Sequence, residues 1–559
     1  MRSRRSVQVL LVMMFSAAAW GQGGRGRGNQ QTGSQPAGNQ QSAPQAGAAQ
    51  PSANQPAGRG GGAPTTDFYN YDANASSVVV INYAEPVETH QKININGEAF
   101  AYATRAGFFP LKNATSGQSE AHLFFTAYSK DGVSDASTRP IVFFLGGAPG
   151  VSAAWQEFGG LGPKRAKFGG SAPGGTPDGA WLENPNTILN QADLVFVNPV
   201  GTAFSRPDQP TRGPSFWNTA GDIASLGEFV RSYINRYNRR TSPLFLAGED
   251  FGTGRAAGLA AYLHEHQIPV HGLALFSMTM SADAAAGDAQ YITLLPSLVM
   301  SAWYHKKLAP DLSAMSAEQI AGQARQFASR EYLHALYKGD RLTAEERTKV
   351  AADLSRLTGL SKAFVTNNNL RISLDRFNQE LMRDQQLGMS NSDARVTGFL
   401  PPPAGGGRGG GGRGGFGGEA QTAIDFNISN LSGEFLNTYE TYLRRELTFN
   451  GVADAIYYLT TGGVSAFTST GSDDTSLATA FARNPNLHLF AGINYFDLNT
   501  PFYAAEFTLA HLNVSPEVRA HNITVSRYEA GQMTYLDNKE LAKLQRDLAV
   551  FLSGAVSRK

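Results

Sequence analysis

Short runs of continuous apolar residues, separated by stretches with helical spacing, constrain the fold of this chain more than any other feature. The runs are Pro140–Leu145, Ala192–Val197, Pro243–Ala247 and Leu487–Ala491. Helical spacing follows in Gly221–Tyr237 and Gly252–His264. A strand that is apolar at every position has both faces buried, as in a parallel sheet with helices on each side. The sequence therefore predicts an α/β fold with a mostly parallel central sheet.

The chain also contains a long helical stretch between two parts that are rich in strands. Earlier β-rich runs are SVVVINY from Ser77, AFAYAT and AHLFFTAYS. From Ser316 to Asp384 the spacing is helical, and Ser316-x-x-Gln319 and Thr343-x-x-Glu346 have the form of capping boxes. We expect an α/β core in residues 67–285 and 456–559, with a mainly helical cap over the active-site mouth in residues 286–455.

The N-terminus has the pattern of a secretory signal. Three arginines within Met1–Arg5 precede the apolar run Val7–Trp20, and small residues follow at Ala19 and Gly21. The apolar run is shorter than the roughly 20 residues that span a bilayer. We predict that residues 1–21 are a signal peptide, that the protein is periplasmic or secreted, and that no stable membrane anchor remains after cleavage.

Two tracts account for the glycine excess. Of the 61 glycines, 12 lie in residues 21–62 and 11 in residues 405–418. Residues 22–66 have no acidic, aromatic or large aliphatic residue, which predicts a disordered linker. The segment Ala404–Gly418 resembles Arg-Gly-Gly segments of RNA-binding proteins. In a chain of net charge +1 we expect a flexible surface insertion and no nucleic-acid partner.

The absence of cysteine narrows the chemistry further. With Cys 0, the chain has no disulfide framework, no thiolate metal site and no thiol nucleophile. The adjacent acids Glu249 and Asp250 are poor metal ligands as a pair, because neighbours in a tight turn tend to point apart. We expect no metal site and no cofactor.

One strand–turn–helix segment carries the chemistry. Within Pro243–Leu263, a strand ends at Ala247, the turn Gly248–Gly252 follows, and a helix of small residues leaves. This is the frame of a nucleophile elbow, G-x-S-x-G, in which the glycines permit close approach of strand and helix. The central residue is Asp250 instead of serine, and the chain contains no G-x-S-x-G.

With this segment and others, the chain resembles the serine carboxypeptidases of α/β-hydrolase fold, particularly their bacterial branch. The resemblance covers most of residues 95–555. It rests on segments in the family's order and spacing: Arg139–Trp155, Gly159–Arg165, Leu194–Pro207, Gly248–Ala260, Tyr495–Leu512 and Tyr528–Leu536. The resemblance implies peptide C-termini as the ligand class.

The resemblance also implies the positions of the catalytic triad. The family's serine falls on Asp250, its aspartate on Asp497 and its histidine on Gln532, so that only Asp497 has the expected chemistry. A serine needs a base to take its proton, and an amide at Gln532 has no useful basicity. A carboxylate at Asp250 would also repel both the developing oxyanion and a substrate's C-terminal carboxylate.

The resemblance also places further positions of the family's site, some of which are substituted here. Gly146, followed by Gly147, stands at the position where an asparagine of the family binds the substrate's carboxylate. The family's glutamate that takes part in carboxylate recognition is retained as Glu249. Ala148 and Phe251 fall on the oxyanion-hole positions.

We therefore expect a catalytically impaired or inactive homologue. One alternative is an active carboxypeptidase that uses unrecognised residues. Another is a hydrolase with Asp250 as nucleophile, for which Glu529 is a conceivable base and for which His511 and His521 are the histidines closest in sequence. The oligomeric state is not predicted.

Overall fold

The computed structural model describes residues 85–95, 97–168, 177–279, 281–400, 425–451, 457–460, 467–468 and 473–557. All of them belong to the compact unit Asp67–Lys559. The predicted signal peptide and linker, the run from Ser77 and the glycine-rich insertion 404–418 lie outside the described residues. Within these ranges no helix is long and apolar enough to cross a membrane.

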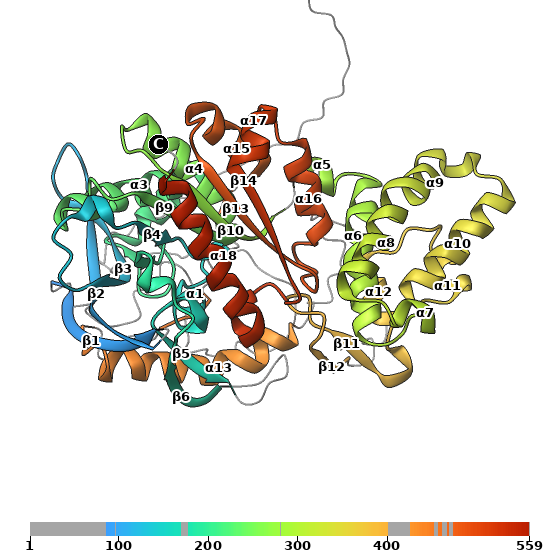
Figure 1. The fold of residues 1–559 in the computed structure, drawn as a ribbon, viewed down its shortest axis with the longest axis horizontal. Coiled ribbons are helices and arrows are strands. Elements are labelled where there is room, and N and C mark those ends of the chain that lie inside the picture. The colour runs from blue at the N-terminus through green and yellow to red at the C-terminus, as the bar shows by residue number, and fades with distance from the viewer. Residues whose placement is uncertain are drawn as a thin grey trace, which may run out of the picture. The chain divides into compact units, whose positions relative to one another are not determined.

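A ten-stranded mixed sheet forms the centre of this unit (Figure 1), with the order β1-β2-β3-β7-β4-β9-β10-β13-β14 and β8 paired to β3. The strands are β1 (Val87–Ile95), β2 (Glu98–Lys112), β3 (Ser119–Lys130), β4 (Ile141–Phe144), β7 (Asp193–Val197), β8 (Arg206–Pro207), β9 (Leu244–Asp250), β10 (Gly272–Met278), β13 (His488–Asn494) and β14 (Ile523–Tyr528). From β7 to β14 all neighbours are parallel, whereas β1, β2, β3 and β7 pair antiparallel.

Both faces of the parallel part are covered, because alternate residues of each strand enter different core clusters. Ile141 and Phe143 pack with α3 (Thr219–Arg236) and α4 (Gly252–Glu265). Val142 and Phe144 pack in the cluster that contains α18 (Asn538–Ser557). This confirms the predicted sheet with helices on each side. The predicted runs coincide with β4, β7, β9 and β13, whereas β10, between β9 and β13, was not predicted.

A block of helices follows β10 and lies beyond α16 (Phe502–His511), against which its first helix packs (Figure 1). It comprises α6 (Ala289–Tyr304), α7 (Pro310–Ser313), α8 (Ala317–Phe327), α9 (Leu333–Lys338), α10 (Ala344–Thr358), α11 (Lys362–Asn367) and α12 (Leu374–Glu380). Ser316 and Thr343 both form the predicted capping boxes, with Gln319 and Glu346.

The later helix α13 (Phe426–Arg445) packs instead against the hairpin β5 (Lys164–Phe168) and β6 (Pro177–Glu183). A small hairpin, β11 (Leu387–Met389) and β12 (Thr397–Phe399), follows α12. The remaining α-helices of the described part are α1 (Ala154–Gln156), α2 (Gly213–Phe216), α5 (Ala282–Ala285), α15 (Asp473–Arg483) and α17 (Pro516–Asn522).

Candidate functional site

Asp250 lies in a sharp turn between β9 and α4. It is the last residue of β9, its φ is 52°, and α4 begins two residues later at Gly252. A positive φ is uncommon for a residue with a side chain and marks a strained backbone. The chain makes this turn at the carboxyl ends of the parallel strands, where α/β proteins commonly bind ligands.

The glycines on either side of Asp250 are required by the packing of the turn. A Cβ atom on Gly248 would lie 2.0 Å from the carbonyl oxygen of Gly252, and one on Gly252 would lie 2.2 Å from that of Gly146. Strand β9, the start of α4 and the turn after β4 therefore touch through their backbones. This confirms the close approach of strand and helix that Gly248 and Gly252 predict.

Arg255 fastens the turn after β4 to α4. Its guanidinium donates hydrogen bonds to the carbonyl oxygens of Leu145 (2.9 Å) and Gly147 (2.8 Å), and it forms an ion pair with Asp222 at 2.5 Å. The structure thus places Gly146, Gly147 and the following Ala148 next to the turn that holds Asp250. Arg255 was not predicted as a site residue. The one feature of the sequence that distinguishes it is a charged side chain in a helix of small residues.

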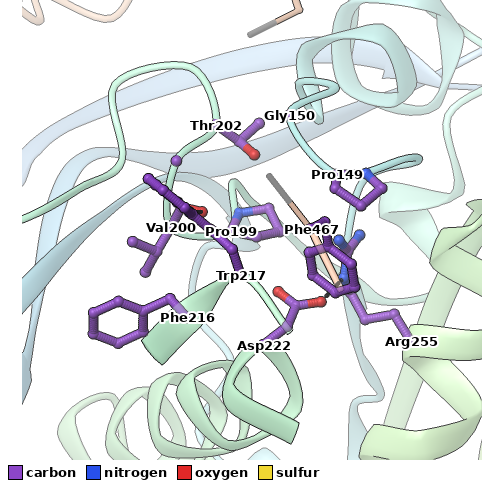
Figure 2. Close-up of a pocket in the computed structure, with 11 residues that line it drawn as sticks. Pro149, Gly150, Pro199, Val200, Thr202, Phe216, Trp217, Asp222, Arg255 and Phe467 are labelled. Carbon is purple, nitrogen blue, oxygen red and sulfur yellow. Dashed lines mark hydrogen bonds and ion pairs between the residues drawn. The ribbon is translucent and has the colours of Figure 1, made fainter. Parts of the chain in front are cut away.

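A small cavity lies beside these residues (Figure 2). Its volume is about 10 Å³, which is the space of a single water molecule. Its walls are Pro149, Gly150, Pro199, Val200, Gly201, Thr202, Phe216, Trp217, Asp222, Arg255 and Phe467. The ring of Phe251 packs edge-on against Phe467 at 5.2 Å and under the Arg255 guanidinium at 5.5 Å. Phe251 therefore packs beside this cavity, on the side of the elbow that faces Arg255.

Glu249 lies on the buried side of the elbow. It is 4% exposed, and its carboxyl accepts hydrogen bonds from the Tyr535 hydroxyl (2.9 Å) and the Gln156 amide (3.5 Å). Burial raises the pKa of Glu249 to about 8, with further contributions from the charges of Asp250 and Asp497. At neutral pH the protonated form of Glu249 is thus favoured.

Asp497 follows β13 and is fully buried. One carboxyl oxygen accepts hydrogen bonds from the backbone N–H groups of Asn499 (2.9 Å) and Thr500 (3.0 Å), and the other accepts one from the Thr500 hydroxyl. Burial raises the pKa of Asp497 to about 7, and the charge of Asp250 acts in the same direction.

Asp250 is the most accessible of the three carboxyls, being only partly buried. Burial raises its pKa to about 6, whereas the backbone N–H of Phe251, a predicted oxyanion-hole donor, lowers it. Because the charge of Asp250 raises the pKa of both Glu249 and Asp497, the three carboxyls share one electrostatic environment.

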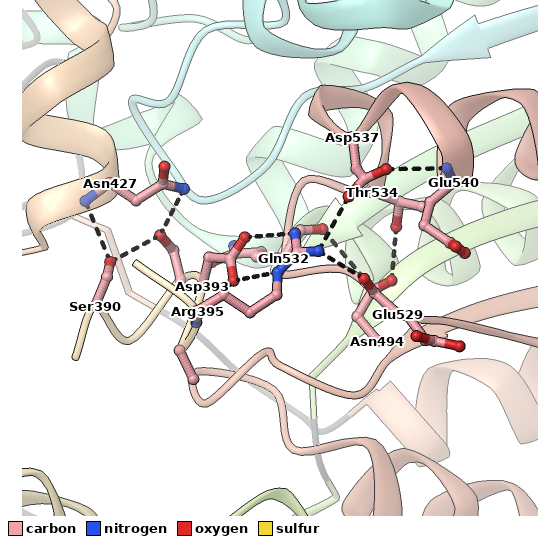
Figure 3. Close-up of polar contacts among 12 residues, drawn as sticks. Ser390, Asp393, Arg395, Asn427, Asn494, Glu529, Gln532, Thr534, Asp537 and Glu540 are labelled. Atoms are coloured by element: carbon pink, nitrogen blue, oxygen red, sulfur yellow. Dashed lines mark hydrogen bonds and ion pairs between the residues drawn. The ribbon is translucent and has the colours of Figure 1, made fainter. Parts of the chain in front are cut away.

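Gln532, labelled in Figure 3, lies in the turn after β14. Its backbone N–H donates to the carbonyl oxygen of Ser392 (2.7 Å), its backbone carbonyl accepts from the Ser277 hydroxyl (2.9 Å), and its side-chain oxygen accepts from the Asn499 amide (2.9 Å). Asn499 thereby connects Gln532 to Asp497. Ser277 precedes Met278, the residue that pairs with Asp250 across β9 and β10.

The structure therefore gathers the three predicted triad positions around the tip of β10. Ser277 and Asn499, which bind Gln532, and Tyr535, which binds Glu249, were not predicted. A serine at the end of an apolar strand has no motif that would mark it. Tyr535 and Asn499 do fall inside the segments that carry the family resemblance.

No histidine stands beside Asp250. All ten histidines lie in the described ranges, and none of them forms a hydrogen bond with Asp250. His511 and His521 are exposed and contact carbonyl oxygens of their own helices, those of Phe507 and Glu517. Glu529 is exposed as well. Within the described part of the chain, no group of three or more acidic or histidine side chains is arranged to hold a metal ion.

The parallel sheet with helices on both faces and a sharp strand–helix turn at its carboxyl edge define an α/β-hydrolase fold. Residues 96–384 match the family model described as serine carboxypeptidase, and the chain belongs to that family. No curated protein matches it.

Two solved structures are similar to this chain to different degrees. Kex1(delta)p, a prohormone-processing carboxypeptidase from Saccharomyces cerevisiae, is 14% identical with a TM-score of 0.50, over 81% of this chain and 91% of the other. Proline iminopeptidase from Mycobacterium smegmatis is 12% identical with a TM-score of 0.35, over 81% and 99%.

Proposed function

We propose that this chain is an exported member of the serine carboxypeptidase family, of its bacterial branch, that lacks serine-type peptide hydrolysis. The observation that carries the proposal is Asp250, which occupies the strained turn between Gly248 and Gly252 where a nucleophilic serine would stand. A carboxylate there cannot perform the serine's proton-coupled attack.

The missing base supports the same conclusion. Gln532 occupies the histidine position, and its side-chain oxygen already accepts a hydrogen bond from Asn499. An amide neither takes a proton from a hydroxyl nor returns one to a leaving amine at neutral pH. Asp497 therefore has no imidazole to orient, and its carboxyl is satisfied by Asn499 and Thr500 instead.

The oxyanion side is unfavourable as well. The N–H of Phe251 faces the Asp250 carboxyl, so that a negative charge already lies where a tetrahedral intermediate would place its own. We propose that the site binds peptides without cleaving them, and that the signal-like residues 1–21 direct the protein to the periplasm or the cell exterior.

The activity test uses N-blocked dipeptides and a serine-directed phosphonate probe on the full chain. The native protein should show neither turnover nor labelling. The variant Asp250→Ser with Gln532→His restores the nucleophile and the base, and it should gain phosphonate labelling relative to Asp250→Ser alone, because the hydroxyl then has a proton acceptor. Asp375→Asn, on exposed α12, is the matched control.

Turnover by the native chain that disappears in Asp250→Ala would contradict the proposal, since it would show Asp250 acting as a nucleophile. Export is tested separately by expressing the full chain in a bacterium and measuring the mass of the product. A mature protein that begins near residue 22 in the periplasm or medium supports export, and an uncleaved chain in the cytoplasm contradicts it.

A further inference from the structure

The Asp250 carboxyl has no cationic partner in the described part of the chain. The adjacent cation, Arg255, is committed to Asp222 in an ion pair of 2.5 Å, with the two side chains 2% and 6% exposed. Its Nη1 group donates to the carbonyl oxygens of Leu145 and Gly147. A partly buried carboxylate without a counter-charge is costly, and a ligand that supplies the charge is favoured there.

The acids behind Asp250 cannot provide the missing charge, and neither is available to a ligand. Glu249 is 4% exposed and closed in by Tyr535, and Asp497 is fully buried. Both raise the density of negative charge around Asp250 whenever they ionise. Asp250 is therefore the least buried carboxyl of this group.

A second observation is an unpartnered hydrogen-bond acceptor beside Glu249. The side-chain oxygen of Gln156 is buried and has no hydrogen-bond partner among the described residues, although the amide nitrogen of the same group lies 3.5 Å from Glu249. Unpartnered buried polar atoms are rare in folded proteins and cost stability. The described surroundings of Asp250 thus supply no positive charge, and one acceptor beside Glu249 lacks a donor.

We propose that this site binds the protonated α-amino group of a peptide, with Asp250 as its charge partner. An ammonium group carries three N–H donors and one positive charge, and the positive charge is what Asp250 lacks. A C-terminal carboxylate brings further acceptors and a like charge. The inference rests on the proposed function, and it states which end of a peptide the non-hydrolytic site takes.

Three probes of one sequence test it by calorimetry at pH 7.5 with the full chain. They are Phe-Ala-Ala-amide with a free amine, acetyl-Phe-Ala-Ala with a free carboxylate, and acetyl-Phe-Ala-Ala-amide with neither. The free amine should bind at least tenfold more tightly than the doubly blocked peptide, and the carboxylate no more tightly than the blocked one. Asp250→Asn should remove most of the preference for the amine, whereas Asp375→Asn should leave it unchanged.

Equal binding of the three peptides, a preference for the carboxylate, or no binding of any of them would overturn the inference. So would an amine preference that persists in Asp250→Asn. Mass spectrometry of the recovered peptides separates this result from the proposed function: cleaved peptide refutes the loss of hydrolysis, whereas intact peptide without amine preference refutes the amine site alone.

Discussion

The hydroxyl of Tyr535 donates a hydrogen bond of 2.9 Å to the carboxyl of Glu249, and both side chains are buried. The bond ties the last residues of β9 to the segment that follows Gln532. Burial raises the pKa of Glu249 to about 8, and the bond from Tyr535 opposes that rise. A hydroxyl binds an ionised carboxylate more strongly than a neutral acid, so this bond strengthens as the pH passes 8.

Tyr535→Phe should therefore destabilise the fold in a pH-dependent way. We expect a loss of about 1 kcal/mol at pH 6 and about 2–3 kcal/mol at pH 9, measured by urea unfolding. Tyr332→Phe is the matched control, because Tyr332 is also buried but donates to the uncharged carbonyl of Leu370 at 2.7 Å. A Tyr535→Phe penalty as flat with pH as that of Tyr332→Phe would show that Glu249 does not ionise in this range.

The backbone contacts of the elbow predict a strong effect of small substitutions. Gly248→Ala and Gly252→Ala each place a methyl group about 2 Å from a backbone oxygen, so either should cost about 3 kcal/mol or more, seen as a lower thermal midpoint. Gly322→Ala is the control, since nothing lies near its Cβ position in α8, and it should gain up to about 1 kcal/mol. Normal stability of Gly252→Ala would mean that the turn after β4 can move away.

Much of the fold could be predicted because its signals are local. The apolar runs that became β4, β7, β9 and β13 report burial on both faces, and the pairs at Ser316 and Thr343 report helix starts. β10 was missed although it has the same composition. Its place between β9 and β13 is set by long-range pairing that no short window contains.

The site likewise has parts that the sequence predicts and parts that it does not. The glycines around Asp250 predict a tight turn, and the family's spacing indicates Asp497 and Gln532. The side chains that hold these residues and Glu249 could not be predicted in this way, because Ser277, Asn499 and Tyr535 lie at or after the ends of three different strands. The raised pKa values of Glu249 and Asp497 follow from burial and from the nearby charge of Asp250, which act only in the folded chain.

A segment after α12 holds the loops that carry Asp497 and Gln532. Arg395 forms a bidentate ion pair with Asp393 and also binds Asp537 (3.0 Å) and the carbonyl of Glu529 (2.7 Å), as Figure 3 shows in part. Arg395→Met keeps much of the apolar stem but removes these bonds. Amide hydrogen exchange in residues 529–537 should then quicken by about tenfold or more.

Arg356→Met provides the comparison for Arg395→Met, because Arg356 makes an exposed ion pair with Asp311 in the helical block. It should leave exchange in residues 529–537 unchanged. Equal protection in both variants would show that the backbone bonds of Ser392 and Ala394 to Gln532 and Phe496 suffice to hold the loops.

Stability should fall as the pH rises, because several buried acids have a higher pKa in the folded chain than in the unfolded one. Burial raises the pKa to about 8 for Glu249, about 7 for Asp497 and about 6 for Asp250. It also raises that of Glu157 to about 7, against hydrogen bonds from Tyr128 (2.5 Å) and Tyr439 (2.8 Å). The folded state thus keeps protons that the unfolded chain releases.

The stability that these protons confer is complete below the unfolded values near pH 4 and is lost as the pH rises through 6 to 8. Urea midpoints should therefore be higher at pH 5 than at pH 8. From its raised pKa we expect Glu157 to contribute on the order of 3 kcal/mol to this pH dependence. Glu157→Gln should therefore reduce the difference between pH 5 and pH 8, whereas Glu345→Gln, at an exposed position on α10, should not. A midpoint that rises between pH 5 and pH 8 would show that these carboxyls are charged in the folded chain.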